Sequence, residues 1–123
     1  MRTKSEAARW SASKGAAFER EVAAAIAHVT GRHVIRNTLE RVTGNNGDLI
    51  VDLPITVQCK VGLTPPVWEA IAESIEVGAR QNKHPVAILR RNAKVGRPKQ
   101  DVAVMPLDVF LELLGLLAGR GIW

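Results

Sequence analysis

Apolar residues recur with a helical period near the start of the chain. The stripe consists of Phe18, Val22, Ile26 and Val29. Its spacing predicts a helix over 16–29, with Ser13 as the N-cap and Thr30-Gly31 as the end. Residues 1–13 are small and polar, so we expect a flexible arm there, ahead of a single domain over 14–123.

Short apolar runs of the kind found in strands occupy the middle of the chain. They cover 33–36, 48–53, 55–60, 86–89 and 101–105. A tight turn at Pro54 joins the second run to the third, and the residues at 43–47, Thr-Gly-Asn-Asn-Gly, form a loop by composition. The pattern therefore predicts five short strands, two of them paired across Pro54.

A second helix is predicted over 67–80, after the helix-opening pair Pro65-Pro66. Its apolar face would carry Trp68, Ile71 and Ile75. The opposite face would carry Glu69, Glu73 and Glu76, which we interpret as a solvated surface.

A leucine-rich helix is predicted after Pro106. Its apolar residues exceed one buried stripe and include Val109, Leu113, Leu116 and Leu117. A second apolar face on a terminal helix favours an interface, and so a homodimer, over a helix buried within one chain. The order helix, three strands, helix, two strands, helix predicts an α/β (α+β) three-layer sandwich around a mixed sheet of about five strands.

Composition narrows the class of protein. The 123 residues are 46% hydrophobic, enough for the core of one domain. No apolar run approaches the roughly 20 residues of a membrane span, and the N-terminus lacks the apolar segment of a secretory signal. Cys59 is the single cysteine. It excludes an internal disulfide and a multi-cysteine metal site, and it favours a reducing cytoplasm.

The formal charge of +5 is concentrated in one segment. No Asp or Glu lies between Glu76 and Asp101, whereas basic residues recur from Arg80 to Lys99. Such a segment favours a nucleic-acid partner over a basic loop kept for solubility. A membrane surface is disfavoured because the run lacks an amphipathic helix. We expect phosphate contacts from Arg90, Arg91, Lys94, Arg97 and Lys99.

Candidate chemistry lies on the strands around Pro54. Alternation of side chains places Thr56, Gln58 and Lys60 on one face of their strand. Asp48 opens the preceding strand, so its carboxylate and the amide oxygen of Gln58 could hold a hard cation such as Mg²⁺. The main-chain oxygen of Cys59 could add a third ligand.

Two further roles complete this hypothesis. Lys60 would orient the attacking water or stabilise the negative charge that develops on a phosphate. A carboxylate on the first helix would face the cation, directly or through water. Glu19 is preferred over Glu21 for this role, and a helix-start carboxylate favoured by the dipole is the alternative for either residue.

The motifs together resemble a small PD-(D/E)xK nuclease, and more narrowly the Holliday junction resolvases of archaea and phages. Three segments carry the likeness. Residues 14–21 read Lys-Gly-Ala-Ala-Phe-Glu-Arg-Glu, residues 44–48 form a Gly-rich loop ending in Asp48, and residues 58–60 read Gln-Cys-Lys. The likeness covers about residues 14–117 and is closest to compact phage-encoded versions with a basic loop between the last two strands.

This resemblance implies a restriction-endonuclease-like sandwich and a homodimer that makes paired Mg²⁺-dependent nicks in four-way DNA junctions. Mn²⁺ is an expected substitute for Mg²⁺, and no small-molecule substrate is implied. The implied site contains Glu19, Asp48, Gln58 and Lys60, the first three as metal ligands. Lys14 and Arg36 join the basic segment as implied DNA contacts.

One position departs from the resolvase pattern. Gln58 stands where those enzymes usually carry Glu, and Gln-Cys-Lys resembles the Mrr-like restriction branch instead. The change removes one negative charge, so cation binding is expected to be weaker. Two alternatives therefore stay open. One is another PD-(D/E)xK nuclease acting on flaps, single strands or duplex sites, and the other is a catalytically weak DNA-binding module.

Overall fold

The computed structural model describes residues 4–37 and 48–119 of the chain. Its elements are α1 (Lys4–Thr30), β1 (Val34–Arg36), β2 (Leu49–Val51), β3 (Ile55–Gly62), α3 (Val67–Gln81), β4 (His84–Arg91), β5 (Gln100–Val104) and α4 (Leu107–Gly119). They follow one another as the sequence predicts, and they confirm an α/β class with a five-stranded mixed sheet. None of the described helices is long and apolar enough to cross a membrane.

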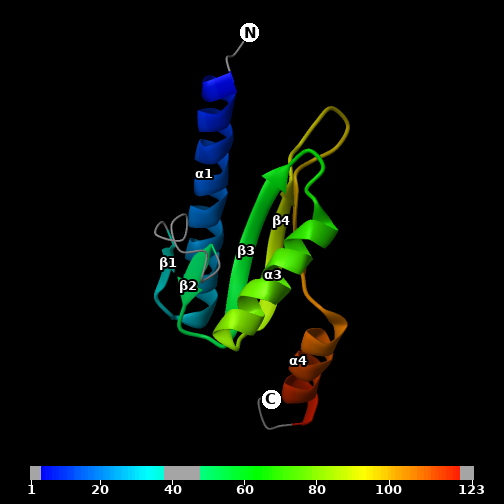
Figure 1. The fold of residues 1–123 in the computed structure, drawn as a ribbon. Helices are drawn as coiled ribbons and strands as arrows, with labels where there is room; N and C mark the ends of the chain where they lie inside the picture. Colours follow the sequence, from blue (N-terminus) through cyan, green and yellow to red (C-terminus); the bar gives the residue numbers. More distant parts are fainter. Residues whose placement is uncertain (1–3, 38–47, 120–123) are drawn as a thin grey trace.

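The strands lie in the sheet in chain order, β1-β2-β3-β4-β5. The first three strands pair antiparallel, with Leu49 opposite Val57. β3 and β4 run parallel because α3 carries the chain back across the sheet, and β5 returns antiparallel along β4. β5 is therefore an edge strand of the sheet that the structure describes (Figure 1).

Each face of the sheet packs against a different helix. On the α1 face, Ala23 packs with Leu49 and Val57, and partly buried residues surround them. On the other face, Ala70 and Ile71 of α3 pack with Ala87 and Leu89 of β4. The result is three layers, α1, sheet and α3, with α4 standing off one end (Figure 1). Because side chains alternate along β3, Thr56, Gln58 and Lys60 belong to the α3 face.

Two backbone features hold α3 against the sheet. Gly78 lies so close to the next segment that an added Cβ would meet the Lys83 carbonyl oxygen at 2.7 Å. Asn82 ends the helix in the left-handed conformation, with φ 53° and ψ 48°, which Asn tolerates better than most residues. The close packing at Gly78 lets β4 begin directly beneath the end of α3.

The start of α1 corrects one expectation. The helix begins at Lys4 rather than near residue 16, so Ser13 lies within it and is not its N-cap. The segment preceding Gly15 is rich in alanine, the best helix former, and lacks proline. The helical pattern therefore continues without an apolar stripe to signal it. The arm assigned to residues 1–13 stays a prediction as a functional unit, and the predicted loop at 43–47 lies outside the described residues.

The apolar face predicted for α3 is also partly wrong. Ile71 is buried, but Trp68 is 84% exposed and Ile75 is 47% exposed. The buried side instead contains Ala70, Ile71, Ser74, Val77 and Gly78. Small residues pack closest to the sheet, and this leaves the largest apolar side chain of the helix outside the layer.

Candidate functional site

Asp48 and Gln58 face each other at the point where β2 begins. The Asp48 N–H donates to the Val57 main-chain oxygen and to Gln58 Oε1, each at 2.9 Å. In return, Asp48 Oδ2 accepts the Cys59 N–H at 2.7 Å. We call this reciprocal set of hydrogen bonds the Asp48–Gln58 clasp. It fixes a carboxylate and an amide on adjacent strands, as the sequence predicts, so both positions are brought together.

Lys60 lies two residues beyond Gln58 on the same face of β3. Its ammonium group is 3.0 Å from Glu73 Oε2 of α3, and both side chains remain partly exposed. The sequence assigned Glu73 to a solvated helix surface, so its contact with the site was missed. No pattern within α3 indicated which of its three glutamates would face β3, because that depends on how the helix packs on the sheet.

Glu19 approaches from α1 on the other side of β2. Its carboxylate is 3.6 Å from Arg36 Nη2, and both side chains are largely covered. Arg36 also lowers the pKa of Asp48, so its charge acts on both carboxylates. The charged groups follow one another with alternating sign: Glu19, Arg36, Asp48, Lys60 and Glu73.

Burial raises the pKa of the Asp48 carboxyl above its ordinary value of 3.8. The Cys59 N–H and the Lys60 ammonium oppose the rise, Glu73 adds to it, and Arg36 opposes it. Burial also raises the pKa of the Cys59 thiol, with Asp48 and Glu19 contributing. Cys59 is therefore a packing residue with an un-ionised thiol at neutral pH, and the surroundings of Asp48 disfavour the negative form of its carboxyl group.

The donors around Asp48 suit a single hard cation. In 4–37 and 48–119 no three His, Cys, Asp or Glu side chains gather closely enough to hold a metal ion. A cation at Asp48 would therefore draw its other ligands from the Gln58 amide, main-chain oxygens and water, all hard oxygen donors. Its positive charge would relieve the desolvation that raises the Asp48 pKa, so the residues present fit such an ion.

The predicted DNA contacts divide into two groups. Arg90 points into the molecule: its side chain is 15% exposed, lies 4.6 Å from the Phe18 ring centroid, and pairs with Glu21 and Asp101. Arg97 donates to the main-chain oxygens of Leu63 and Asn92. These two arginines hold the fold together locally, although their assignment as DNA contacts stays a prediction.

The second group, Arg91, Lys94 and Lys99, lies nearer to solvent. Lys94 and Arg97 close a tight turn by reciprocal main-chain hydrogen bonds of 3.0 and 2.9 Å, and Lys94 and Lys99 are exposed. The loop projects beyond the sheet at the end opposite α4 (Figure 1). Arg91 is half-buried and donates to Gln100 at 3.4 Å. The Lys14 side chain lies outside the described residues.

Comparison with protein-family models and with curated proteins gave no match in either case.

Proposed function

We propose that the protein is a metal-dependent DNA endonuclease that cuts branched DNA, with a four-way junction as its preferred substrate and a homodimer as its working form. The observation that carries this proposal is the Asp48–Gln58 clasp, which holds a partly buried carboxylate and an amide oxygen on the same face as Lys60. A carboxyl group whose pKa is shifted by burial and by specific charged neighbours is typical of functional sites.

The side chains at the clasp have distinct roles in this proposal. Hydrolysis of a phosphodiester needs a water aligned on phosphorus and a counter-charge for the phosphate oxygens. Lys60 supplies that charge or orients the water. Glu73 keeps the Lys60 ammonium in place from α3, so we assign it as a positioning residue. Glu19 acts from α1, on the far side of Arg36.

Asp48 and Gln58 would hold Mg²⁺, or Mn²⁺ in its place, with the Cys59 main-chain oxygen as a further ligand and Glu19 reaching the ion through water. When bound, the ion neutralises charge at the phosphate and favours ionisation of water. One carboxylate and one amide carry less charge than two carboxylates. We therefore expect a single ion of modest affinity rather than a two-metal site.

Exposed basic residues beyond the end of β4 provide a surface for the DNA backbone. Lys94 and Lys99 are exposed there, and the half-buried Arg91 lies at the edge of this surface. Contacts to phosphate give affinity without reading the base sequence. Arg90 and Arg97 support this surface from beneath by their internal contacts. A site that recognises the backbone and shape of DNA suits a substrate defined by branching rather than by sequence.

The decisive test offers the protein a synthetic four-way junction and a linear duplex of the same sequence with Mg²⁺. We expect paired nicks in the junction alone, and at least a ~100-fold loss of rate in Asp48→Asn. Asp52→Asn is the matched control, because Asp52 lies on the same hairpin with an exposed side chain paired to Arg32. Its rate should equal that of the wild type.

Other outcomes separate the alternatives. Equal cleavage of both substrates would indicate a general nuclease, and tight junction binding without cleavage in Mg²⁺ or Mn²⁺ would indicate a DNA-binding module. A protein that neither binds nor cuts DNA would contradict the whole proposal. Gln58→Glu sharpens the choice: in an enzyme it should raise Mg²⁺-dependent cleavage while junction affinity stays unchanged.

A further inference from the structure

The last helix has an apolar surface that no described residue of its own chain buries. None of the described residues of α4 is buried. Its large exposed side chains are 39% to 69% accessible and comprise Leu107, Phe110, Leu111, Leu113, Leu114 and Leu116. A helix that is apolar around most of its circumference is normally enclosed by other elements. The 3.4 Å pair between Glu112 and His84 ties α4 to the sheet.

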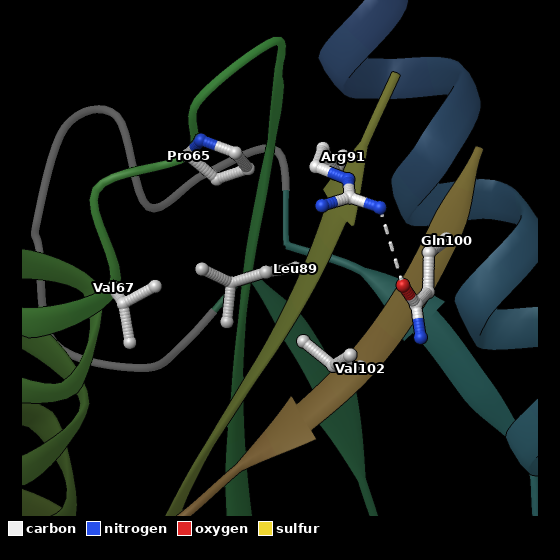
Figure 2. Close-up of a pocket in the computed structure, with 6 residues that line it drawn as sticks. All are labelled: Pro65, Val67, Leu89, Arg91, Gln100 and Val102. Carbon is white, nitrogen blue, oxygen red and sulfur yellow. Dashed lines mark hydrogen bonds between the residues drawn. The ribbon is translucent and has the colours of Figure 1, made fainter. Parts of the chain in front are cut away.

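A matching apolar groove lies beside α3, on the face of the sheet that α3 covers only in part. A cavity of about 200 Å³ opens there, lined by Pro65, Val67, Leu89, Arg91, Gln100 and Val102. Figure 2 shows the apolar side chains around the opening, with Arg91 and Gln100 joined on one side. Val102 of the edge strand β5 is 43% exposed within it. An apolar cavity of ~150 Å³ accommodates benzene, so this one accommodates a leucine or phenylalanine side chain.

α3 carries a further exposed apolar flank, outside the residues that line the cavity. Trp68, Ala72, Ile75 and Ala79 recur at helical spacing, and all four are exposed. The opposite flank carries Glu73, which contacts Lys60 of β3, so the apolar flank lies on the side of α3 away from β3. The misassigned Trp68 and Ile75 thus belong to a second apolar surface rather than to the core.

We propose that α4 of a second copy of this chain occupies the groove between α3 and β5, and that the two copies exchange their last helices reciprocally. Within the part of the chain that the structure describes, each copy supplies one helix and one groove that no other element covers. The charges of helix and groove are complementary. Asp108 and Glu112 are the charged residues in the described part of α4, whereas Arg91 lines the groove and Lys99 directly precedes β5. The same acidic residues disfavour DNA as the occupant.

The area involved is that of a stable dimer. The six exposed side chains of α4 present on the order of 500 Å² of apolar surface. If the groove and the apolar flank of α3 together cover an equal area, and the exchange occurs twice, the dimer would bury on the order of 2,000 Å² in all. This matches the interfaces of stable homodimers.

The connection to α4 favours a second copy over the chain's own groove. Only Met105 and Pro106 separate β5 from α4, and the first helical turn begins at once, with the Phe110 N–H bonded to the Pro106 oxygen. The cavity lies beside the start of β5, whereas α4 leaves from its end. To reach its own groove the helix would have to reverse direction within two residues, one of them a proline with a fixed φ. Exchange of a terminal element across a short hinge avoids that reversal.

Cross-linking with cysteine variants tests the arrangement without DNA or metal, so its outcome is separate from that of the proposed nuclease activity. Ile75→Cys and Leu111→Cys chains of different tag length would be mixed and treated with a short bismaleimide. We expect a cross-linked product that contains one chain of each kind, formed in the mixture and absent from wild type, whose Cys59 is largely covered.

Each contrary product has a definite meaning. Self-cross-linking of Leu111→Cys alone would show two α4 helices packed on each other and would overturn the groove assignment. A double variant that closes within one chain, at monomer mass, would show that α4 folds back. Absence of any mixed product would also contradict the proposal.

Molecular mass from light scattering gives an independent test. Wild type should have twice the 13.4 kDa chain mass, whereas Leu111→Asp should be monomeric with an unchanged circular dichroism spectrum. Val95→Asp is the control, because Val95 is fully exposed in the basic loop, and it should remain a dimer. A monomeric wild type, or a dimeric Leu111→Asp, would overturn the exchange.

Discussion

Two clusters of acidic and basic side chains lie on opposite faces of the same sheet. They differ in how completely each carboxylate is paired with a cation. On the α1 face, Arg90 makes a bidentate pair with Asp101, at 2.7 and 2.9 Å, and a third bond to Glu21. On the α3 face, Asp48 accepts the Cys59 main-chain N–H, and no arginine among the described residues forms a fork with it. The pKa of Asp101 is lowered by Arg90, whereas burial raises the pKa of Asp48.

This contrast separates Asp101, whose charge stabilises the fold, from Asp48, whose charge destabilises it. The arginine fork favours the ionised form of Asp101, so that charge contributes to folding. The ionised form of Asp48 is disfavoured by its surroundings, so the native state holds it at some cost. Sites of that kind are common where a protein binds a cation or performs chemistry.

The largest expected effect on stability follows from replacing Arg90. Arg90→Ala would leave Glu21 and Asp101 without their cation and would uncover Phe18, so we expect the free energy of unfolding to fall by about 2–4 kcal/mol. Arg91→Ala, next in the chain but on the other face, should change it by less than about 1 kcal/mol. Chemical denaturation measures both. Equal losses in the two variants would show that the Arg90 cluster has no special role in stability.

Asp48→Asn should change the free energy of unfolding in the opposite direction. Asparagine keeps the shape and an oxygen for the Cys59 N–H, but it removes a buried negative charge. We expect the variant to be more stable by about 0.5–1 kcal/mol at neutral pH while cleavage is lost, the trade-off typical of functional sites. Denaturation of the metal-free protein provides the measurement. A clear destabilisation would mean that the Asp48 charge contributes to folding.

The pH dependence of the two aspartates distinguishes them further. For Asp101 the folded pKa lies below 3.8, so its contribution is complete above that pH and is lost as the pH falls through the folded value. For Asp48 the folded pKa lies above 3.8, so its cost is absent at low pH and grows as the pH rises through the folded value.

Asp48→Asn and Asp101→Asn should therefore change stability in opposite directions at neutral pH. Both pH-dependent differences from wild type should shrink toward zero in acid. Urea denaturation from about pH 3 to pH 7 measures them. Two curves of the same sign would contradict the contrast between the faces.

The sequence predicted the strands and the clasp better than the surroundings of either cluster. Alternation along one strand is a local property, so the shared face of Gln58 and Lys60 followed directly. Asp48 met Gln58 because a turn at Pro54 fixes the register of a hairpin. These features depend on few residues that are close in the chain.

The remaining contacts join distant segments, and no local pattern specifies them. Glu21 and Arg90 are 69 residues apart, so the basic segment looked free of acidic partners although two carboxylates meet it in space. The contact between Glu73 and Lys60 depends on the rotation of α3 about its axis. That rotation is set by the small residues that pack on the sheet, and these carry a weaker signal than Trp68.

The smallest expected effect on stability is that of replacing either of two glutamates on α3. Each of them forms an ion pair, and the two ion-pair distances are equal. Glu73 lies 3.0 Å from Lys60, and Glu76 lies 3.0 Å from Arg80 on its own helix. Both pairs are partly exposed, so Glu73→Gln and Glu76→Gln should each change stability by less than about 0.5 kcal/mol. Distance alone does not distinguish them.

Their effects on Asp48 should nevertheless differ. Glu73 raises the pKa of Asp48, so Glu73→Gln should lower that pKa, and an NMR titration of the Asp48 carboxyl would record the change. Cleavage should also become slower, because Lys60 would no longer be held in place by Glu73. Glu76→Gln should leave the Asp48 titration and cleavage unchanged. If both variants shifted Asp48 equally, Glu73 would act as a general surface charge rather than as a positioning residue for Lys60. A shift confined to Glu73 would place α3 within the electrostatics of the site.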